Sequence, residues 1–191
     1  MFDEYNVIII IGSTNCGKSS LVKNLFLTDD FTLQRDLMPY MTNGTTAIIG
    51  NYCTGKRRVG NDTVERKQVG NFAQQILNLL ETHKKVILEG IRCVSRPMMN
   101  KILGKVKPLL IFVQCDALTL YHRATSPIGN TGNPPTLEHI KGEITSCVNF
   151  INDFLQEVDV LTIDSTLVTD FTQFGKEPTE YSRLNLNWRG L

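Results

Sequence analysis

The feature that most constrains this chain is the segment Gly12–Ser19, which reads GSTNCGKS. It follows the apolar run Tyr5–Ile11, whose continuous β-branched residues predict a strand buried on both faces. It leads into Lys18–Phe26, where apolar residues recur at helical spacing. The spacing G-x4-G-K-S therefore stands between a predicted strand and a predicted helix, which is the context that a phosphate-binding turn requires.

The glycines of this segment indicate what it binds. Gly12 and Gly17 permit backbone geometry that other residues resist, so the amides of residues 14–20 can turn toward phosphate oxygens at the positive end of a helix. Such a P-loop uses Lys18 to bridge β- and γ-phosphates and the Ser19 hydroxyl to hold Mg²⁺. We expect ATP or GTP, with Mg²⁺, on Gly12, Ser13, Thr14, Asn15, Cys16, Gly17, Lys18, Ser19 and Ser20.

Strands and helices alternate along the rest of the chain, while residues 28–43 are expected to form a connection. Strands are predicted over residues 45–50, 85–88, 109–113 and 159–163, and helices over residues 64–81, 97–103, 118–124 and 136–154. This order predicts one α/β domain over residues 1–191, the three-layer P-loop NTPase fold, with a parallel five-stranded sheet and helices on both faces. A small lid at 118–135 and a polar C-terminal tail at 167–191 complete the expected organisation.

Composition narrows the class of protein. No apolar run approaches the roughly 20 residues that span a bilayer, so we expect no membrane partner. The five cysteines never form CxxC, which predicts reduced thiols in a cytoplasmic setting. Residues 51–110 carry twelve basic and four acidic side chains. This basic segment indicates a polyanionic partner, although solvated surface charges would give the same count.

The third predicted strand ends in a further candidate, Glu89. The run Val86–Gly90 is Walker-B-like, and a carboxylate at the carboxyl end of a central strand lies beside the ligand crevice of such sheets. We expect Glu89 to hold Mg²⁺ through water or to act as a base; a helix cap or a surface carboxylate is the alternative. The D-x-x-G and N-K-x-D motifs of GTPases do not occur.

The P-loop near the first residues and the Gly/Pro-rich loop between two late helices resemble the nucleotide and nucleoside kinase group. In that group the late loop closes over ATP. The resemblance implies that Arg123, at the start of the lid, offsets charge on the transferring group, with Arg92 and Arg96 as further candidates for that role. Lids of adenylate kinases usually carry further arginines, and residues 124–135 contain none. A surface salt bridge is the alternative for Arg123.

The segment Ile49–Thr63, which reads IGNYCTGKRRVGNDT, is the most distinctive. It resembles the "G-x-Y … G-x-D-T" block of phage P-loop kinases that act on 5-hydroxymethyluracil in DNA during thymidine hypermodification. The resemblance covers the P-loop, this block and the E-G-I-R run at 89–92. It implies an ATP-dependent kinase, a DNA substrate and a location in the host cell cytoplasm.

The block supplies candidates for the acceptor side. Asp62 is expected to accept or orient the proton of the attacking hydroxyl, or to cap the helix that follows it. Tyr52 is expected to stack on a base or to pack on the core. The basic side chains are expected to contact DNA phosphates or to form a solvated turn: Lys56, Arg57 and Arg58.

A second acceptor candidate is the pair Arg35–Asp36. Phage polynucleotide kinases use an Asp and an Arg in this region for the acceptor 5′-hydroxyl, but here their order and surroundings differ. Three functions are therefore open. They are a kinase of 5-hydroxymethyluracil in DNA, a deoxynucleoside monophosphate or nucleoside kinase, and a P-loop ATPase or NTP-binding module.

Overall fold

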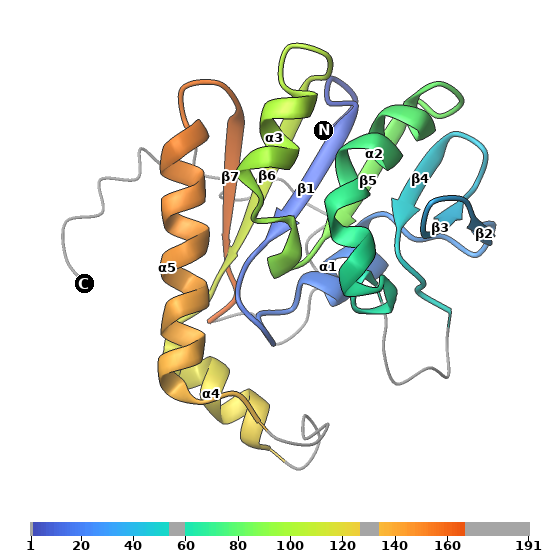
Figure 1. Cartoon of the computed structure of the whole chain (residues 1–191). Coiled ribbons are helices and arrows are strands. Elements are labelled where there is room, and N and C mark those ends of the chain that lie inside the picture. Colours follow the sequence, from blue (N-terminus) through green and yellow to red (C-terminus); the bar gives the residue numbers. More distant parts are fainter. Residues whose placement is uncertain (1, 54–59, 127–133, 167–191) are drawn as a thin grey trace.

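Strand β1 (Val7–Ile11) lies inside a seven-stranded sheet in the computed structural model, which describes residues 2–53, 60–126 and 134–166 (Figure 1). The strand order is β2-β3-β4-β5-β1-β6-β7. Strand β1 pairs in parallel with β5 (Lys85–Glu89) and with β6 (Pro108–Gln114). Two further parallel strands flank these three, β4 (Thr46–Ile49) beside β5 and β7 (Asp159–Asp164) beside β6.

The sheet is mixed, which corrects the expected five-stranded parallel sheet. Strands β2 (Thr32–Arg35) and β3 (Pro39–Thr42) pair antiparallel, and β3 is antiparallel to β4. Both arise from residues 28–43, which were expected to form only a connection. Each has four residues, and β2 at the sheet edge is mostly exposed, so neither carries the apolar alternation that predicts a strand. The α/β class is confirmed.

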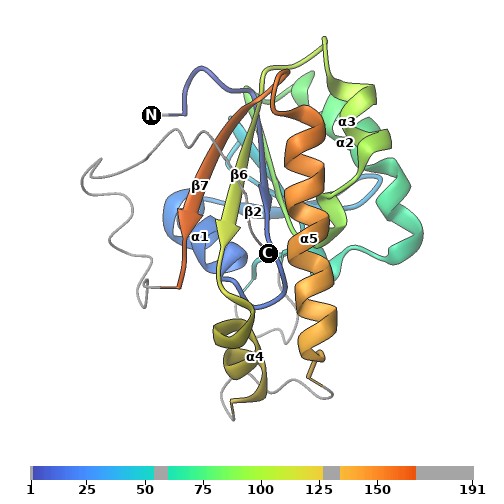
Figure 2. The same ribbon diagram turned by 90° about the vertical axis from the view of Figure 1, so that its left-hand side faces the viewer.

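Helices cover both faces of the sheet (Figure 2). Helices α2 (Phe72–Leu80), α3 (Arg96–Ile102) and α5 (Leu137–Phe154) contribute to one core cluster, whereas α1 (Lys18–Leu25) contributes to the other. Odd-numbered residues of β1 join the first cluster and even-numbered residues the second. Successive side chains of a strand point to opposite faces, so a strand covered on both sides has to be apolar throughout.

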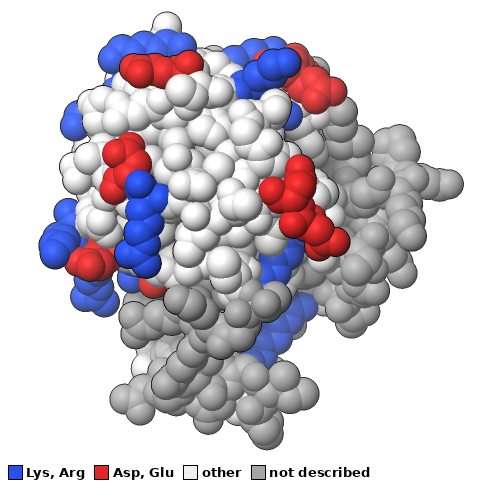
Figure 3. All heavy atoms as spheres, turned by 90° about the vertical axis from the view of Figure 1, so that its right-hand side faces the viewer, with Lys and Arg blue, Asp and Glu red and all other residues white. Residues whose placement is uncertain are grey.

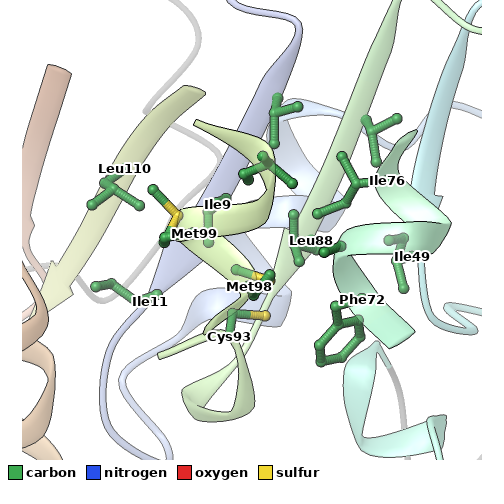
Figure 4. Packing of buried hydrophobic residues seen from close by; sticks show 14 of the residues in the cluster. Ile9, Ile11, Ile49, Phe72, Ile76, Leu88, Cys93, Met98, Met99 and Leu110 are labelled. Carbon is green, nitrogen blue, oxygen red and sulfur yellow. The ribbon is translucent and has the colours of Figure 1, made fainter. Parts of the chain in front are cut away.

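The first of these clusters packs around β1 and β5. Figure 4 shows Ile9 and Leu88 from the sheet beneath Met98 and Met99 of α3, with Phe72 and Ile76 of α2 beside them. Burying such side chains contributes about 1.5–3 kcal/mol each relative to exposure. This packing fixes the strand ends from which the site is built.

Short 3-10 turns and capped helices connect the strands. The turns are η1 (Asn61–Thr63), η2 (Arg66–Asn71) and η3 (Ile91–Cys93), so the helix expected over 64–81 begins only at Phe72. Helix α4 (Ala117–Thr125) follows β6. Side chains cap three helices by accepting a backbone N–H in the first turn: Ser95 at α3, Asp116 at α4 and Thr136 at α5.

Two of the expected segments lie wholly or partly outside the described residues. Helix α4 covers the first part of the expected lid, but residues 127–133 are not described, nor is the tail at 167–191. Within the described ranges, none of the helices has the length and apolar character needed to cross a membrane. None of the five cysteines, all of which lie in the described ranges, forms a disulfide.

Candidate nucleotide-binding site

The segment Gly12–Ser19 forms the turn between β1 and α1, at the carboxyl edge of the parallel strands (Figure 1). A Cβ at Gly12 would lie 2.5 Å from the Val113 carbonyl oxygen of β6, so only glycine fits against that strand. Gly17 has φ 97° and stands immediately before the first residue of α1. Glycine is thus required at position 12 by the close approach of the β6 backbone and at position 17 by the left-handed backbone conformation.

A cavity of about 520 Å³ opens at this edge of the sheet. Its volume is in the range of small-molecule sites. Half of its lining comes from the P-loop and the first turn of α1, namely Thr14, Asn15, Gly17, Lys18, Ser19 and Ser20. The other half comes from the ends of other elements, namely Asp62, Glu89, Gly90, Ile91, Arg123 and Ser126.

The Lys18 side chain lies along the P-loop. Its Nζ donates a hydrogen bond to the Ser13 carbonyl oxygen at 2.6 Å and approaches the Cys16 sulfur at 3.6 Å. Burial disfavours the ammonium, whereas the Cys16 sulfur and the Glu89 carboxylate favour it, and the balance raises the pKa of Lys18 above 10.5. The structure thus holds a cation within the loop.

Glu89 ends β5 as a buried carboxylate, 3% exposed. Its Oε1 accepts a hydrogen bond from Ser19 Oγ at 2.9 Å and one from the Tyr52 hydroxyl at 3.3 Å. Burial raises the pKa of Glu89, and the opposing effects of Lys18 and of the Ser19 hydrogen bond do not cancel that rise. The carboxyl is therefore poised to become more acidic when a cation arrives beside it.

The oxygens of Ser19 and Glu89 fit Mg²⁺. They are hard donors that already meet in this structure, and Mg²⁺ is ordinarily held by one or two protein oxygens together with substrate phosphates and water. The described residues contain no group of three or more His, Cys, Asp or Glu side chains that could hold a metal ion. The donors for Mg²⁺ here are a hydroxyl and a single carboxyl.

The block after β4 folds back on itself and reaches the cavity. Asn51 and Gly60 form an isolated antiparallel bridge, in which the Gly60 amide donates to the Asn51 carbonyl at 2.8 Å. The Thr63 hydroxyl closes it further, because it donates to the Gly60 carbonyl at 2.6 Å and accepts from the Asn51 amide at 2.9 Å. This closure brings Asp62, which is exposed, to the cavity wall.

Tyr52 is a core residue, which corrects its expected role in base stacking. Its side chain is 1% exposed, so neither face of its ring is available to a base. Burial, followed by the neighbouring Glu89 carboxylate, raises the pKa of Tyr52 well above its ordinary value, so the hydroxyl remains a donor to Glu89. The other candidates of the block, Lys56, Arg57 and Arg58, lie outside the described residues.

The three candidate arginines are separated in space. Arg123 lines the cavity, and its guanidinium also donates to the Ser165 carbonyl at 2.7 Å, which ties α4 to the end of β7. Arg92 instead donates to the Val64 carbonyl at 2.7 Å and does not line the cavity. Arg96 also lies outside the lining and forms an exposed ion pair with Asp153. The cavity therefore has one of the three expected arginines.

The second acceptor candidate is likewise remote from the cavity. Arg35 and Asp36 are exposed at the turn between β2 and β3, and neither lines the cavity. Arg35 and Asp36 therefore do not lie beside the P-loop, where an acceptor site would have to be.

Glu143 of α5 contacts the P-loop, and the sequence did not single it out. Its Oε2 accepts hydrogen bonds from Ser13 Oγ and from the Thr14 amide, both at 2.7 Å, and its Oε1 accepts one from Thr14 Oγ1 at 3.1 Å. It lies about 130 positions from the loop in the sequence and belongs to no motif. No local signal could have identified it.

Comparison with models of known protein families and with curated proteins finds no match for this chain. What can be said of its chemistry therefore rests on the site itself. Fold and site together define an α/β protein with a glycine-bounded loop, a buried lysine and a hydroxyl–carboxyl pair around one cavity.

We predict that Gly60→Ala disrupts this site. Gly60 has φ +63°, and a Cβ there would lie 2.1 Å from Glu89 Oε1 and 2.9 Å from the Tyr52 hydroxyl oxygen. We expect a loss of about 2 kcal/mol or more in the free energy of unfolding, from backbone strain together with the displaced buried carboxyl. Urea unfolding of the variant measures this loss.

Gly44→Ala is the matched control for that substitution. Gly44 also has a positive φ, +83°, but a Cβ there meets nothing within 4 Å. It should lose only the roughly 1–2 kcal/mol that a left-handed backbone conformation costs an L-residue. Equal losses in the two variants would contradict a specific contact between Gly60 and Glu89.

Proposed function

We propose that this chain is an ATP- and Mg²⁺-dependent kinase with a P-loop NTPase fold, which phosphorylates the hydroxymethyl group of 5-hydroxymethyluracil in DNA. One observation carries the proposal. The P-loop and the candidate acceptor carboxylate Asp62 line the same cavity, with Glu89 between the elements that supply them. A phosphoryl donor and a hydroxyl acceptor can therefore meet there.

The donor half of the mechanism is assigned to the P-loop. Its amides and Lys18 would hold the β- and γ-phosphates, while Ser19 and Glu89 would hold Mg²⁺. When bound, Mg²⁺ supplies charge neutralisation on the phosphates. The Arg123 guanidinium, which also lines the cavity, would offset the charge that develops on the transferring group.

The acceptor half is assigned to Asp62. The hydroxymethyl oxygen attacks the γ-phosphorus and forms a new P–O bond, while the bond from the γ-phosphorus to the β–γ bridging oxygen breaks and releases ADP. The proton of the hydroxyl passes to the Asp62 carboxylate, which lies exposed at the cavity wall.

A kinase of deoxynucleoside monophosphates or nucleosides is the second candidate. One observation favours a small acceptor. Among the described residues on the face of the molecule in Figure 3, basic and acidic side chains are interspersed. A DNA backbone is instead bound by basic side chains that neutralise several phosphates together.

Transfer from radiolabelled γ-phosphate ATP separates these functions. The protein, with Mg²⁺, would be offered duplex and single-stranded DNA containing 5-hydroxymethyluracil, matched DNA containing thymine, and free nucleosides and nucleotides. Label on the modified DNA alone supports the first proposal. Saturable label on a free nucleotide without DNA supports the second, and ATP hydrolysis with no labelled acceptor would leave an ATPase.

Asp62→Asn tests the acceptor assignment. Loss of the proton acceptor should reduce turnover by about 100-fold or more, while the affinity for ATP changes by less than about threefold because the phosphates are held elsewhere. Asp36→Asn is the control, since Asp36 is equally exposed but does not line the cavity. Near wild-type turnover of Asp62→Asn would mean that Asp62 is only a residue of the turn η1 and not the proton acceptor.

A further inference from the structure

Glu143 makes a contact with the P-loop that the mechanism above does not use. The residue lies in the second turn of α5, and its side chain is only 11% exposed. Three donors of the loop converge on its carboxylate, namely the hydroxyls of Ser13 and Thr14 and the Thr14 amide. This is the most extensive hydrogen bonding between α5 and the loop among the described residues.

These hydrogen bonds fix the part of the loop that lies next to its unfavourable backbone conformation. Asn15 follows directly and has φ +62°, a left-handed conformation that is unfavourable for a residue other than glycine by about 1 kcal/mol. The Ser13 carbonyl accepts a hydrogen bond from the Lys18 ammonium, and the Ser13 hydroxyl donates one to Glu143. One residue therefore connects Lys18 to Glu143. A shift of Ser13 and Thr14 would therefore move both the backbone turn and Lys18.

The carboxylate is ionised where it lies. Burial by itself raises the pKa of Glu143, but the hydrogen bonds from the Thr14 amide and the Ser13 and Thr14 hydroxyls outweigh it and lower the pKa. His139, one helical turn earlier, lies 3.3 Å from Oε1 and adds to that effect. The loop thus receives a charged acceptor, whose hydrogen bonds are stronger than those of a neutral group.

Glu143 itself does not line the cavity, whereas Thr14 does. We propose that Glu143 is a positioning residue that holds the P-loop in its triphosphate-binding shape from outside the cavity, through Ser13 and Thr14. The proposal rests on the proposed function, because it assigns a support to the same nucleotide site. It makes the affinity for ATP depend on a helix that lies far from the loop in sequence.

Two substitutions at Glu143 should differ in their effect on the affinity for ATP. Glu143→Ala removes all three bonds, so the loop loses its order before ATP binds and affinity falls, by about tenfold or more. Glu143→Gln keeps an oxygen for the Ser13 hydroxyl and the Thr14 amide, and it removes a negative charge near a triphosphate. Its affinity should be equal to wild type or up to about threefold tighter.

Titration of the protein with a fluorescent ATP analogue and Mg²⁺ measures these affinities. The kcat and the KM for ATP are measured with the acceptor that the radiolabel assay identifies. Glu138→Ala is the control, since Glu138 is an exposed acid of the first turn of the same helix. A double-mutant cycle with Ser13→Ala then asks whether the pair acts as a unit, in which case the two losses are not additive.

The outcomes are distinct. A rise in the Kd and KM for ATP in Glu143→Ala, with kcat little changed and rescue by Gln, supports the proposal. An unchanged Kd with a lower melting temperature would mean that Glu143 only stabilises the fold. Tighter ATP binding in both variants would mean that the negative charge of Glu143 weakens ATP binding. Either result overturns the proposal. If wild type binds ATP but labels no acceptor, the kinase proposal fails while the Kd comparison still decides the role of Glu143.

Discussion

Lys18→Ala is expected to reduce phosphoryl transfer by about 100- to 1,000-fold. The ammonium is held by the Ser13 carbonyl inside the loop that is proposed to bind the phosphates, so it need not be recruited from solvent. Alanine removes the positive charge, and no other group replaces it. Steady-state turnover with ATP and the labelled acceptor measures the loss.

The chain should still fold in this variant. Lys18 lies at the first position of α1, where alanine is a favourable helix residue, and the removed ammonium leaves Glu89 able to take up a proton because burial raises its pKa. Lys23→Ala is the control, as an exposed lysine in the last turn of α1. Turnover of Lys18→Ala close to that of Lys23→Ala would refute the assignment of the cavity.

The features that the sequence predicted are those that local chemistry determines. The turn at Gly12–Ser19 and the buried strand before it depend on residues that are neighbours in the chain. Glu89 was also predictable, because the carboxyl ends of parallel strands meet at one edge of the sheet, whatever their order. The P-loop and Glu89 line one cavity for this reason.

The features that the sequence missed depend on contacts between distant segments. Strands β2 and β3 are short and depend on pairing with β4 rather than on a pattern of their own. Whether Tyr52 stacks on a ligand or packs in the core is decided by how closely the block folds against Glu89, which no periodicity reveals. Glu143 is selected by the position of α5 beside the loop.

The two halves of the site also differ in how firmly they are built. On the donor side, the backbone conformation of the turn and hydrogen bonds from Lys18 and Ser19 fix the loop. On the acceptor side, Asp62 is exposed, and its block is closed only by the bridge between Asn51 and Gly60 and by the Thr63 hydroxyl. The residues proposed to bind the donor are therefore held more firmly than the residue proposed to bind the acceptor.

Glu89 joins the two halves, and Glu89→Gln should separate its functional role from its effect on stability. Loss of the carboxylate removes the ligand for Mg²⁺ or the base, so turnover should fall by about 100-fold or more. The amide oxygen can still accept from Ser19 and Tyr52, so the local geometry should persist. Stability should rise at neutral pH, because burial makes the ionised carboxyl unfavourable in the folded state.

The pH dependence of this gain has a definite sign. The folded pKa of Glu89 lies above its ordinary value of 4.5, so the folded chain holds a proton that the unfolded chain releases. The contribution of Glu89 to stability therefore falls as pH rises from about 4.5 through the folded pKa, and the penalty is complete above it. Glutamine does not titrate, so the advantage of the variant should be absent at low pH and grow across that window.

Urea unfolding of wild type and Glu89→Gln across about pH 4 to pH 8 measures this difference. Glu81→Gln is the control, since it makes the same change of side chain at an exposed residue at the end of α2, away from Glu89. A variant that is less stable than wild type at neutral pH would mean that the attraction between Glu89 and Lys18 exceeds the penalty of burial. The carboxyl would then stabilise the fold as well as serve the reaction, and the expected opposition between activity and stability at this residue would be wrong.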